Sequence, residues 1–491
     1  QLHCPDRTCD FRRGLPIYVI DDDIYEEKPD VVIGTVDKFA MLAWRPRART
    51  LFGLDESGNR IASPPGLIIQ DELHLISGPL GSMVGLYESL IEELCTDRRH
   101  GSAVPPKIVS STATIRRYEE QIEGLYARDD VTLFPPPGLE EGDSFFSSYA
   151  RNEDGELLPG KKYVGVHAPG LPSLQTTQVR TFSSLLMAPV PFNEEERDPW
   201  WTLLTFYNSL RELGGARSLF QSDIPEHIRG MKKRTGADRR RPLKQVQELT
   251  GRISGEKVTE AIAELETPTN GEGDPIDACL ASNIVEVGVD IDRLSLMAVV
   301  GQPKTTSQYI QVTGRIGRRW RERPGLVVTL YSTSKPRDRS HFEKFRSYHE
   351  RLYAQVEPSS VTPFSPPSLD RALHAIMVAY VRQFTDDEAT PYPVPVERLK
   401  QLHDLLRPRV EEVDPQELDT FDRIFEKRIE EWKNWSPVNW TQEEDDPGLM
   451  HRSGKHVPSR FRDSTWAVPM NMRNVDAECV LEISNSRSPG D

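Results

Sequence analysis

The amino-acid sequence predicts an α/β protein with two parallel-sheet domains, an irregular insertion between them and a helix-rich C-terminal region. Three observations support this prediction. Apolar runs alternate with helical patterns before about residue 120, the alternation resumes near Trp201, and Pro- and Gly-rich sequence separates the two parts. Parallel strands need crossover connections, usually helices, so this alternation is typical of parallel sheets.

The first domain is expected over residues 1–130. Its candidate strands are the β-branched or apolar runs 15–20, 30–34, 67–70 and 107–114. The run that ends at Ile69 is interpreted as a buried parallel strand. A helix is expected over 83–94, because apolar residues recur there at the helical period.

Residues 131–195 are expected to form an insertion or connector, since irregular sequence rich in proline and glycine begins at Phe134. The second domain is expected over 196–335, with a helix from about Ser209 and strands at 203–207, 276–281, 296–301 and 326–331. Residues 336–491 form the predicted helix-rich region and a polar tail. The basic segment 229–244 fits a solvated loop and a phosphate-backbone contact about equally well.

Composition narrows the class of protein. Of the 491 residues, 37% are hydrophobic and 28% are charged. The sequence contains no apolar run long enough to span a membrane, and it does not open with a signal peptide, so we expect a cytoplasmic globular protein. Five cysteines favour a reducing compartment. The net charge of −15 means that any polyanion site must be a local basic groove. Because Gln1 is not Met, we expect a processed chain or part of a longer one.

Two adjacent carboxylates follow the predicted strand 67–70, in the segment Asp71-Glu72-Leu73-His74, which we call the carboxylate turn. Mg²⁺ prefers hard oxygen ligands and an attacking water needs a base, so Asp71 is the candidate Mg²⁺ ligand and Glu72 the candidate base. His74 is a candidate nucleotide-site residue. The alternative is a solvated charged turn.

Small hydroxyl residues end the next predicted strand, in Ser111-Thr112-Ala113-Thr114. Such residues can donate hydrogen bonds to the neighbouring carboxylate turn and so link the nucleotide state to domain position. The alternative is a tight loop without a function of its own.

Two arginines lie three residues apart in Gln311-Val-Thr-Gly-Arg-Ile-Gly-Arg318, which we call the arginine turn. Arg315 and Arg318 suit a phosphate chain, because guanidinium groups bind phosphoryl oxygens in a planar fork. Gln311 and Gly314 are candidate nucleotide-site residues in the same turn. The alternative is a pair of surface salt bridges.

Two further segments are candidate ligand contacts. In Ala281–Ile291, Gly288 and Asp290 are expected at an interdomain nucleotide cleft, and Ser282 and Asn283 near nucleic acid; the alternative is a helix-to-strand turn. In Gly34-Thr-Val-Asp-Lys38, Thr35 and Lys38 are positioned to bind a backbone phosphate. A plain strand-end turn explains this second segment almost as well.

Cys4 and Cys9 form half of a possible zinc site, because a four-ligand site needs two more ligands. Cys95 and Cys279 lie in apolar sequence and are expected in the core.

Taken in order, these segments resemble the motifs of superfamily 2 DExH helicases over residues ~30 to ~335. Further segments resemble the DrmA family, the helicase subunits of bacterial DISARM anti-phage defence: 34–39, 69–81, 134–139, 360–364 and 472–476. The resemblance implies two RecA-like domains that bind ATP and Mg²⁺ and move along DNA, with a DrmB-like second subunit. It also implies that Asp71 holds Mg²⁺, Glu72 activates water, and Arg315 and Arg318 contact the γ-phosphate.

The sequence departs from that family at one point. No Gly-x-x-x-x-Gly-Lys-Ser/Thr loop precedes Asp71, so ATP hydrolysis is expected only where such a loop lies upstream in the full protein. Two alternative functions remain: a non-catalytic DNA-binding scaffold that recruits an effector, and an RNA helicase.

Overall fold

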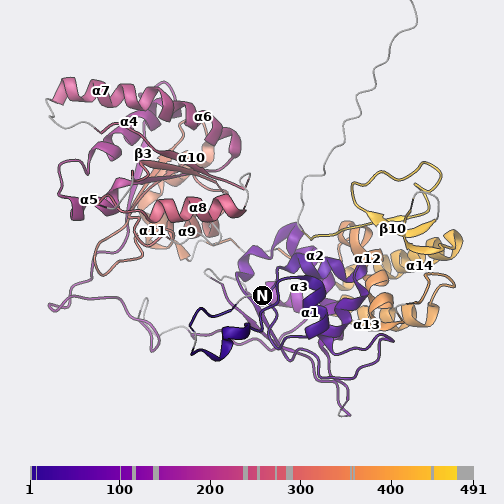
Figure 1. The fold of residues 1–491 in the computed structure, drawn as a ribbon. Coiled ribbons are helices and arrows are strands. Elements are labelled where there is room, and N and C mark those ends of the chain that lie inside the picture. The colour runs from indigo at the N-terminus through magenta and orange to yellow at the C-terminus, as the bar shows by residue number, and fades with distance from the viewer. Residues whose placement is uncertain are drawn as a thin grey trace, which may run out of the picture. The chain divides into compact units, whose positions relative to one another are not determined.

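The computed structural model divides the chain into two compact units, drawn in Figure 1. The first consists of Gln1–Thr132 and Pro358–Asp491, and the second of Leu133–Glu357. The described residues are 3–472, without 7, 100, 113–117, 137–142, 236–240, 252–254, 271–273, 283–290, 354–355, 358–359, 387 and 444–446. The helix-rich C-terminal sequence from Pro358 onward therefore belongs to the same unit as the carboxylate turn.

The second unit is built on a six-stranded, fully parallel sheet with the order β3-β8-β7-β4-β6-β5. Its four inner strands are apolar runs buried on both faces, and these are the strands that the sequence predicts. The strand bounds are β3 Lys162–His167, β4 Leu203–Tyr207, β5 Val246–Leu249, β6 Ala278–Ala281, β7 Leu296–Val300 and β8 Leu326–Tyr331.

Helices cover both faces of this sheet, as Figure 1 shows. α4 (Leu174–Met187), α6 (Leu210–Gln221) and α7 (Asp223–Thr235) pack on one face. α8 (Gly255–Glu266), α9 (Thr306–Thr313) and α11 (Phe345–Glu350) pack on the other, while α5 (Glu194–Trp201) and α10 (Pro336–Glu343) complete the unit. Because β3 and α4 belong to these layers, ordered structure begins inside the range 131–195 that the sequence suggests is irregular.

The first unit combines a small sheet with a helical core. Its helices are α1 Asp21–Glu27, α2 Gly78–Cys95, α3 Tyr118–Tyr126, α12 Pro366–Phe384, α13 Val396–Val413 and α14 Leu418–Trp435, with 3-10 turns η1 Asp10–Arg13, η2 Val36–Ala43, η3 Pro46–Phe52, η4 Leu73–Leu75 and η7 Pro415–Glu417. The strands are β1 Leu67–Gln70 and β2 Lys107–Ser110, which form a parallel pair, and β9 Asn439–Thr441, β10 Gly448–Arg452 and β11 Trp466–Val468. α2 and α12, both largely buried, supply much of the core, and the helix predicted over 83–94 is confirmed as part of α2.

Three expectations for the first unit are wrong. Runs 15–20 and 30–34 form no strand, and the sheet that holds β1 has two strands in the described residues rather than an open set. The run 30–34 is solvated, since Ile33 is 93% exposed. The strand β1 is parallel but not buried, because Leu67 and Ile69 are 53% and 69% exposed. Apolar character indicates a buried strand only where a second layer covers it.

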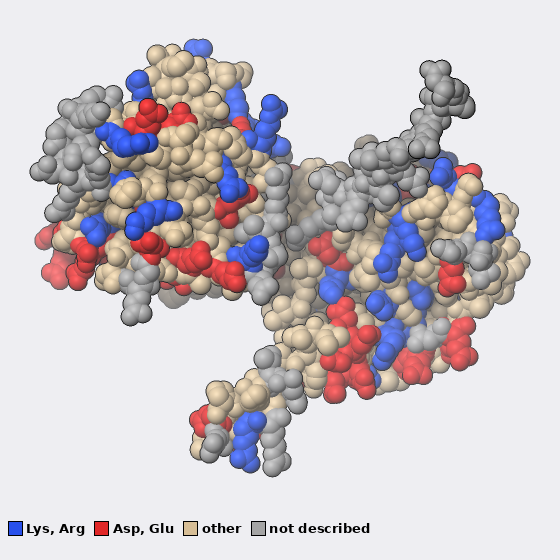
Figure 2. All heavy atoms as spheres, turned by 45° about the horizontal axis from the view of Figure 1, so that its top comes forward, with Lys and Arg blue, Asp and Glu red and all other residues tan. Residues whose placement is uncertain are grey.

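Charge is mixed on the surface of both units. On the face shown in Figure 2, basic and acidic side chains are interspersed, in keeping with the net charge of −15. Among the described helices, none combines the length and apolar composition that a bilayer crossing requires.

Candidate functional site

The carboxylate turn lies directly after β1 and leads into η4. Glu72 adopts a left-handed backbone conformation (φ 53°), which is uncommon for a residue with a side chain. The next side chain, Leu73, is buried in the core, and its backbone N–H donates to the Ser111 carbonyl (2.9 Å). The turn is thus held between β1 and the end of β2 in a strained conformation of the kind that often occurs at functional sites.

Asp71 is fixed through one of its two carboxylate oxygens. Oδ1 accepts hydrogen bonds from the Ser111 hydroxyl and from the Glu72 backbone N–H (3.0 Å). Among the described residues, Oδ2 receives no hydrogen bond. The predicted contact between the hydroxyl segment and the carboxylate turn is therefore confirmed, and the bonds described here engage only one oxygen of Asp71.

His74 connects the same two segments. Its Nδ1 lies 3.0 Å from the Thr112 hydroxyl, and its Nε2 lies 3.4 Å from Oε2 of Glu72. Burial lowers the pKa of His74, although the Glu72 and Asp71 carboxylates act in the opposite direction. The lowered pKa favours the uncharged form of the imidazole in its contact with Glu72.

Gln121 on α3 supports the turn and is not indicated by the sequence. This buried side chain donates from Nε2 to the carbonyls of Leu73 (2.9 Å) and Ile76 (2.8 Å). It therefore ties both ends of η4 to α3. A lone glutamine in a helical segment carries no sequence signal for such a role.

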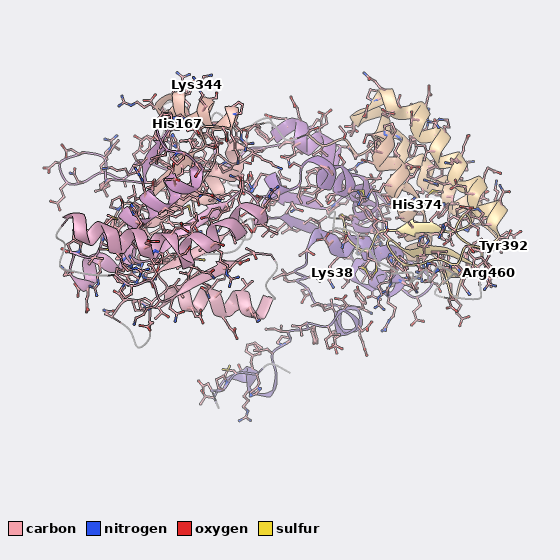
Figure 3. The ribbon with its side chains drawn as sticks, turned by 90° about the horizontal axis from the view of Figure 1, so that it is seen from above. Lys38, His167, Lys344, His374, Tyr392 and Arg460 are labelled. Carbon is pink, nitrogen blue, oxygen red and sulfur yellow. The ribbon has the colours of Figure 1, made fainter. Side chains whose placement is uncertain are left out.

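Thr35 and Lys38 lie at the start of η2 and are both exposed. The Lys38 ammonium, labelled in Figure 3, donates to both carboxylate oxygens of Asp21 at 2.8 Å. A backbone phosphate that bound Lys38 would have to compete with this carboxylate, although an exposed ion pair of this kind is weak.

The arginine turn of the second unit begins in the last residues of α9 (Thr306–Thr313) and continues beyond the helix. The helix begins at a Thr305 cap and ends at Gly314, whose N–H donates to the Ile310 carbonyl (2.8 Å). Ile316 is buried, Arg315 is half-buried and Arg318 is exposed. Gly317 has φ +65°, so the two arginines lie on a turn rather than on successive turns of a helix.

Gly317 must be glycine for a second reason. A Cβ at this position would lie 2.7 Å from Cα of Gly325, at the start of β8. The Gly317 N–H also donates to the Leu294 carbonyl (2.9 Å). The backbone of the arginine turn is therefore pressed against the sheet.

Polar groups fix α9 from the other side. The Tyr309 hydroxyl lies 3.0 Å from both the Thr329 hydroxyl and Nε2 of His349. The Glu357 carboxylate accepts from the Thr306 backbone N–H (2.8 Å). Because these partners come from β8, α11 and the end of the unit, the helix that carries Gln311 is rigidly placed.

The remaining nucleic-acid and cleft candidates are only partly described. Ser282 is buried at the end of β6, which weakens its assignment as a direct nucleic-acid contact. Asn283, Gly288 and Asp290 lie outside the described residues, as do Ala113 and Thr114.

Cys4 and Cys9 form no disulfide bond and are partly exposed, and the Cys4 N–H donates to the Phe11 carbonyl (3.2 Å). Within the described part of the chain, no group of three or more His, Cys, Asp or Glu residues is arranged to hold a metal ion. Cys95 and Cys279 are buried, as predicted, and burial raises the pKa of each thiol to about 12.

Known proteins match the chain by sequence. The family described as Helicase conserved C-terminal domain matches residues 230–319, a range that contains the arginine turn. The DISARM protein DrmA of Bacillus paralicheniformis is 37% identical over 467 residues, which are 88% of this chain and 41% of that protein. The chain therefore spans about two fifths of the length of this relative.

Two solved helicase structures are similar to part of this chain at low sequence identity. The DUF1998 helicase MrfA bound to DNA and AMPPNP is 20% identical, with a TM-score of 0.49 over 73% of this chain and 42% of that one. The Mycobacterium smegmatis helicase Lhr bound to ssDNA and AMP-PNP is 16% identical, with a TM-score of 0.45 over 77% and 42% of the two chains. From the motif order, the parallel sheet and the sequence match to DrmA, the chain belongs to the superfamily 2 helicases.

Proposed function

We propose that the full-length protein is an ATP-dependent DNA helicase or translocase of an anti-phage defence complex. The observation that carries this proposal is the hydrogen-bonded arrangement at the ends of β1 and β2. There the Ser111 hydroxyl donates to Asp71, and His74 contacts both Thr112 and Glu72. A solvated charged turn would need neither a strained backbone at Glu72 nor two cross-strand hydroxyl contacts.

In the first unit, Glu72 is the proposed general base and Asp71 the proposed Mg²⁺ ligand. The Glu72 side chain is 39% exposed, so a water molecule can reach its carboxylate. The donor set fits Mg²⁺, which prefers carboxylate oxygens and water, because no described residue donates a hydrogen bond to Oδ2 of Asp71. Bound Mg²⁺ would neutralise charge on the phosphoryl oxygens.

In the second unit, Arg315 and Arg318 are the proposed contacts to the γ-phosphate, with Gln311 and Gly314 in the same turn. Exposure of Arg318 and the fixed backbone at Gly317 support this role, because a preorganised cation stabilises transition-state charge without reorganisation. Gly288 and Asp290 remain proposed nucleotide-cleft residues. Thr35, Lys38 and Asn283 remain proposed DNA contacts, whereas burial makes Ser282 the weakest of that group.

The defence role is proposed from the similarity to DrmA. If it holds, the protein acts with a second, DrmB-like subunit on DNA. Nucleotide-dependent domain movements would then advance the strand, as closure and opening do in other nucleotide-driven machines.

Glu72→Gln in the full-length protein tests this function. ATP and DNA binding should stay close to wild type, while ATP turnover falls about 100-fold or more, because the amide cannot accept a proton from water. Glu123→Gln is the matched control: Glu123 is exposed on α3 of the same unit and makes no side-chain hydrogen bond among the described residues. Turnover should be measured without nucleic acid, with DNA and with RNA.

Each alternative function predicts a different result. A wild-type protein that binds DNA without turning over ATP would be a scaffold. Stimulation by RNA and not by DNA would indicate an RNA helicase. Wild-type turnover in Glu72→Gln would disprove the role assigned to this carboxylate.

A further inference from the structure

A basic loop, residues 452–465, leads from the last residue of β10 to the start of β11 in the first unit. Figure 1 shows it in yellow near the β10 label. Its cationic side chains, all exposed, are Arg452, Lys455, Arg460 and Arg462. Its one acidic side chain is Asp463. The loop thus reverses the charge balance of the whole chain, whose net charge is −15, and it forms the kind of local basic surface that a polyanion site on an acidic protein requires.

The backbone of the basic loop is constrained. A first turn follows β10, where the Lys455 N–H donates to the Arg452 carbonyl (3.0 Å). A second turn precedes β11, where the Ser464 N–H donates to the Phe461 carbonyl (3.0 Å). Between the turns Val457 is buried, and the strands at the two ends of the loop pair with each other. The cations are therefore presented by two turns of one anchored loop.

Three of these cations have no acidic partner in the described part of the chain. They are Arg452, Lys455 and Arg462, for which neither an ion pair nor a side-chain hydrogen bond is described. Arg460, labelled in Figure 3, differs, because its guanidinium stacks on Phe461 with Cζ 4.8 Å from the ring centroid. Arg460 is therefore not part of the contact proposed below. Like charges on one loop repel each other, and a bound anion removes that repulsion.

We propose that Arg452, Lys455 and Arg462 bind the phosphate backbone of DNA, a role that rests on the proposed function and adds a contact outside its motifs. Phosphates follow one another at regular intervals along a strand, so cations on two turns can each contact a different phosphate. Arginine binds two phosphate oxygens at once and lysine acts as a point charge, and neither contact depends on base sequence. The acidic remainder of the protein opposes this contact only weakly, because charges farther away than about 8 Å are screened at physiological ionic strength.

A phosphate backbone fits this loop better than an acidic protein surface does. A protein interface has an apolar or aromatic centre that becomes fully buried. The basic loop offers no such centre: Val457 is already buried in the unit, and the Phe461 ring is covered in part by Arg460. Interfaces with nucleic acid are more polar and much more positively charged, as this loop is.

The test compares two triple variants of the full-length protein. The first combines Arg452→Gln, Lys455→Gln and Arg462→Gln. The matched control combines Arg371→Gln, Lys400→Gln and Arg423→Gln. The control residues are exposed on α12, α13 and α14 of the same unit, and they form no ion pair among the described residues. Both variants therefore remove three exposed positive charges from one unit.

Fluorescence anisotropy with a labelled DNA oligonucleotide measures affinity from about 50 to 200 mM salt. Each phosphate contact contributes about 0.7–0.9 to the slope of log affinity against log salt, so the first variant should reduce that slope by about 2 to 3. Its affinity for DNA should fall about tenfold or more at the lowest salt, and the control should match wild type. A double variant, Arg452→Lys with Arg462→Lys, keeps the charge and should keep most of the slope.

The outcomes separate this inference from the proposed function. If the first variant keeps the wild-type slope, the basic loop is not a phosphate site, even if wild type is a DNA-stimulated ATPase. A lower Tm with an unchanged slope would assign the three cations to the stability of the unit, for example through the acidic run 443–446, and would overturn the proposal. An equal loss in the charge-conserving variant would do the same.

Two further results concern the ligand and the enzyme. Binding that depends on the loop with RNA and not with DNA would overturn the assignment to DNA. Binding to DNA that depends on the loop, in a protein that does not hydrolyse ATP, would support the loop and count against the proposed enzyme. A wild-type protein that does not bind DNA would overturn both.

Discussion

Replacing Gln121 with leucine should disable the carboxylate turn without unfolding the unit. Gln121 donates to the carbonyls of Leu73 and Ile76, and leucine has a similar size but no amide. The Leu73 carbonyl keeps a second bond, from the Ile76 N–H (2.9 Å), whereas no other bond to the Ile76 carbonyl is described. The variant therefore loses two hydrogen bonds and leaves one buried carbonyl unpaired. Together these effects should cost roughly 2–3 kcal/mol of local stability.

The assay is hydrogen exchange at the amides of the turn, combined with ATP turnover. A loss of 2–3 kcal/mol corresponds to about 30- to 150-fold faster exchange where local opening governs the rate. Turnover without DNA should fall at least about tenfold, because small displacements of a catalytic group are costly.

Gln383→Leu is the matched control for this prediction. Gln383 is also a buried glutamine of the first unit, and its Nε2 donates to the carbonyls of Leu42 (2.9 Å) and Arg45 (3.1 Å). Its loss should destabilise the contact between α12 and η2 by a similar amount and leave DNA-free turnover unchanged. If both variants kept wild-type turnover, or if exchange at the turn did not change, the positioning role of Gln121 would be refuted.

Three further predictions concern other parts of the chain. Arg318→Ala should abolish DNA-stimulated ATP hydrolysis while ATP affinity falls no more than about tenfold, since arginine fingers contribute roughly 10³–10⁵ in rate; wild-type stimulation would favour a surface salt bridge. Metal analysis of the full-length protein should find about one zinc per chain, lost on joint replacement of Cys4 and Cys9 by serine; folded, zinc-free protein would contradict this. Burial lowers the pKa of His374 from 6.5 in the unfolded protein to about 4 in the folded protein. As pH falls, the unfolded protein therefore binds a proton at His374 before the folded protein does, and the free energy of unfolding should drop by up to about 3 kcal/mol between pH 7 and 4. His374→Gln should flatten that dependence in thermal unfolding, and an unchanged slope would refute it.

In the second unit, the sequence analysis finds the inner strands of the sheet and misses the edge strands. The four inner strands have side chains buried on both faces, so they appear as continuous apolar runs. The two strands that the sequence analysis misses, β3 and β5, are the edges of the sheet. Their sequences include Lys162, Gln247 and Glu248, because an edge strand is partly solvated.

In the first unit, the same reasoning predicts too many strands. Val31, Val32 and Ile33 have strand-forming side chains but lie exposed and pair with no strand among the described residues. β-Branched residues favour a strand where neighbouring strands and a covering layer are present. The composition of a segment does not show whether those neighbours exist.

Some residues of the candidate site can likewise be recognised in the sequence, and others cannot. Asp71, Glu72 and Ser111 are found from the sequence because local order places them at strand ends, where parallel strands bring them together. Gln121 is not found, because its contact is with the Ile76 carbonyl, 45 residues away in the sequence.

Both turns use one physical arrangement, in which a buried residue and a constrained backbone hold a charged side chain at the surface. In the first unit the buried residue is Leu73, next to Glu72 with its positive φ. In the second it is Ile316, next to Gly317 with its positive φ, between the two arginines. At Glu72 this conformation is strained and cannot relax unless the buried neighbour leaves the core, so hydrophobic burial holds the strain, whereas Gly317 adopts its positive φ without strain. A backbone constrained in this way positions a charged group before a ligand binds, which is the condition for the electrostatic stabilisation of a phosphoryl group that we propose for these residues.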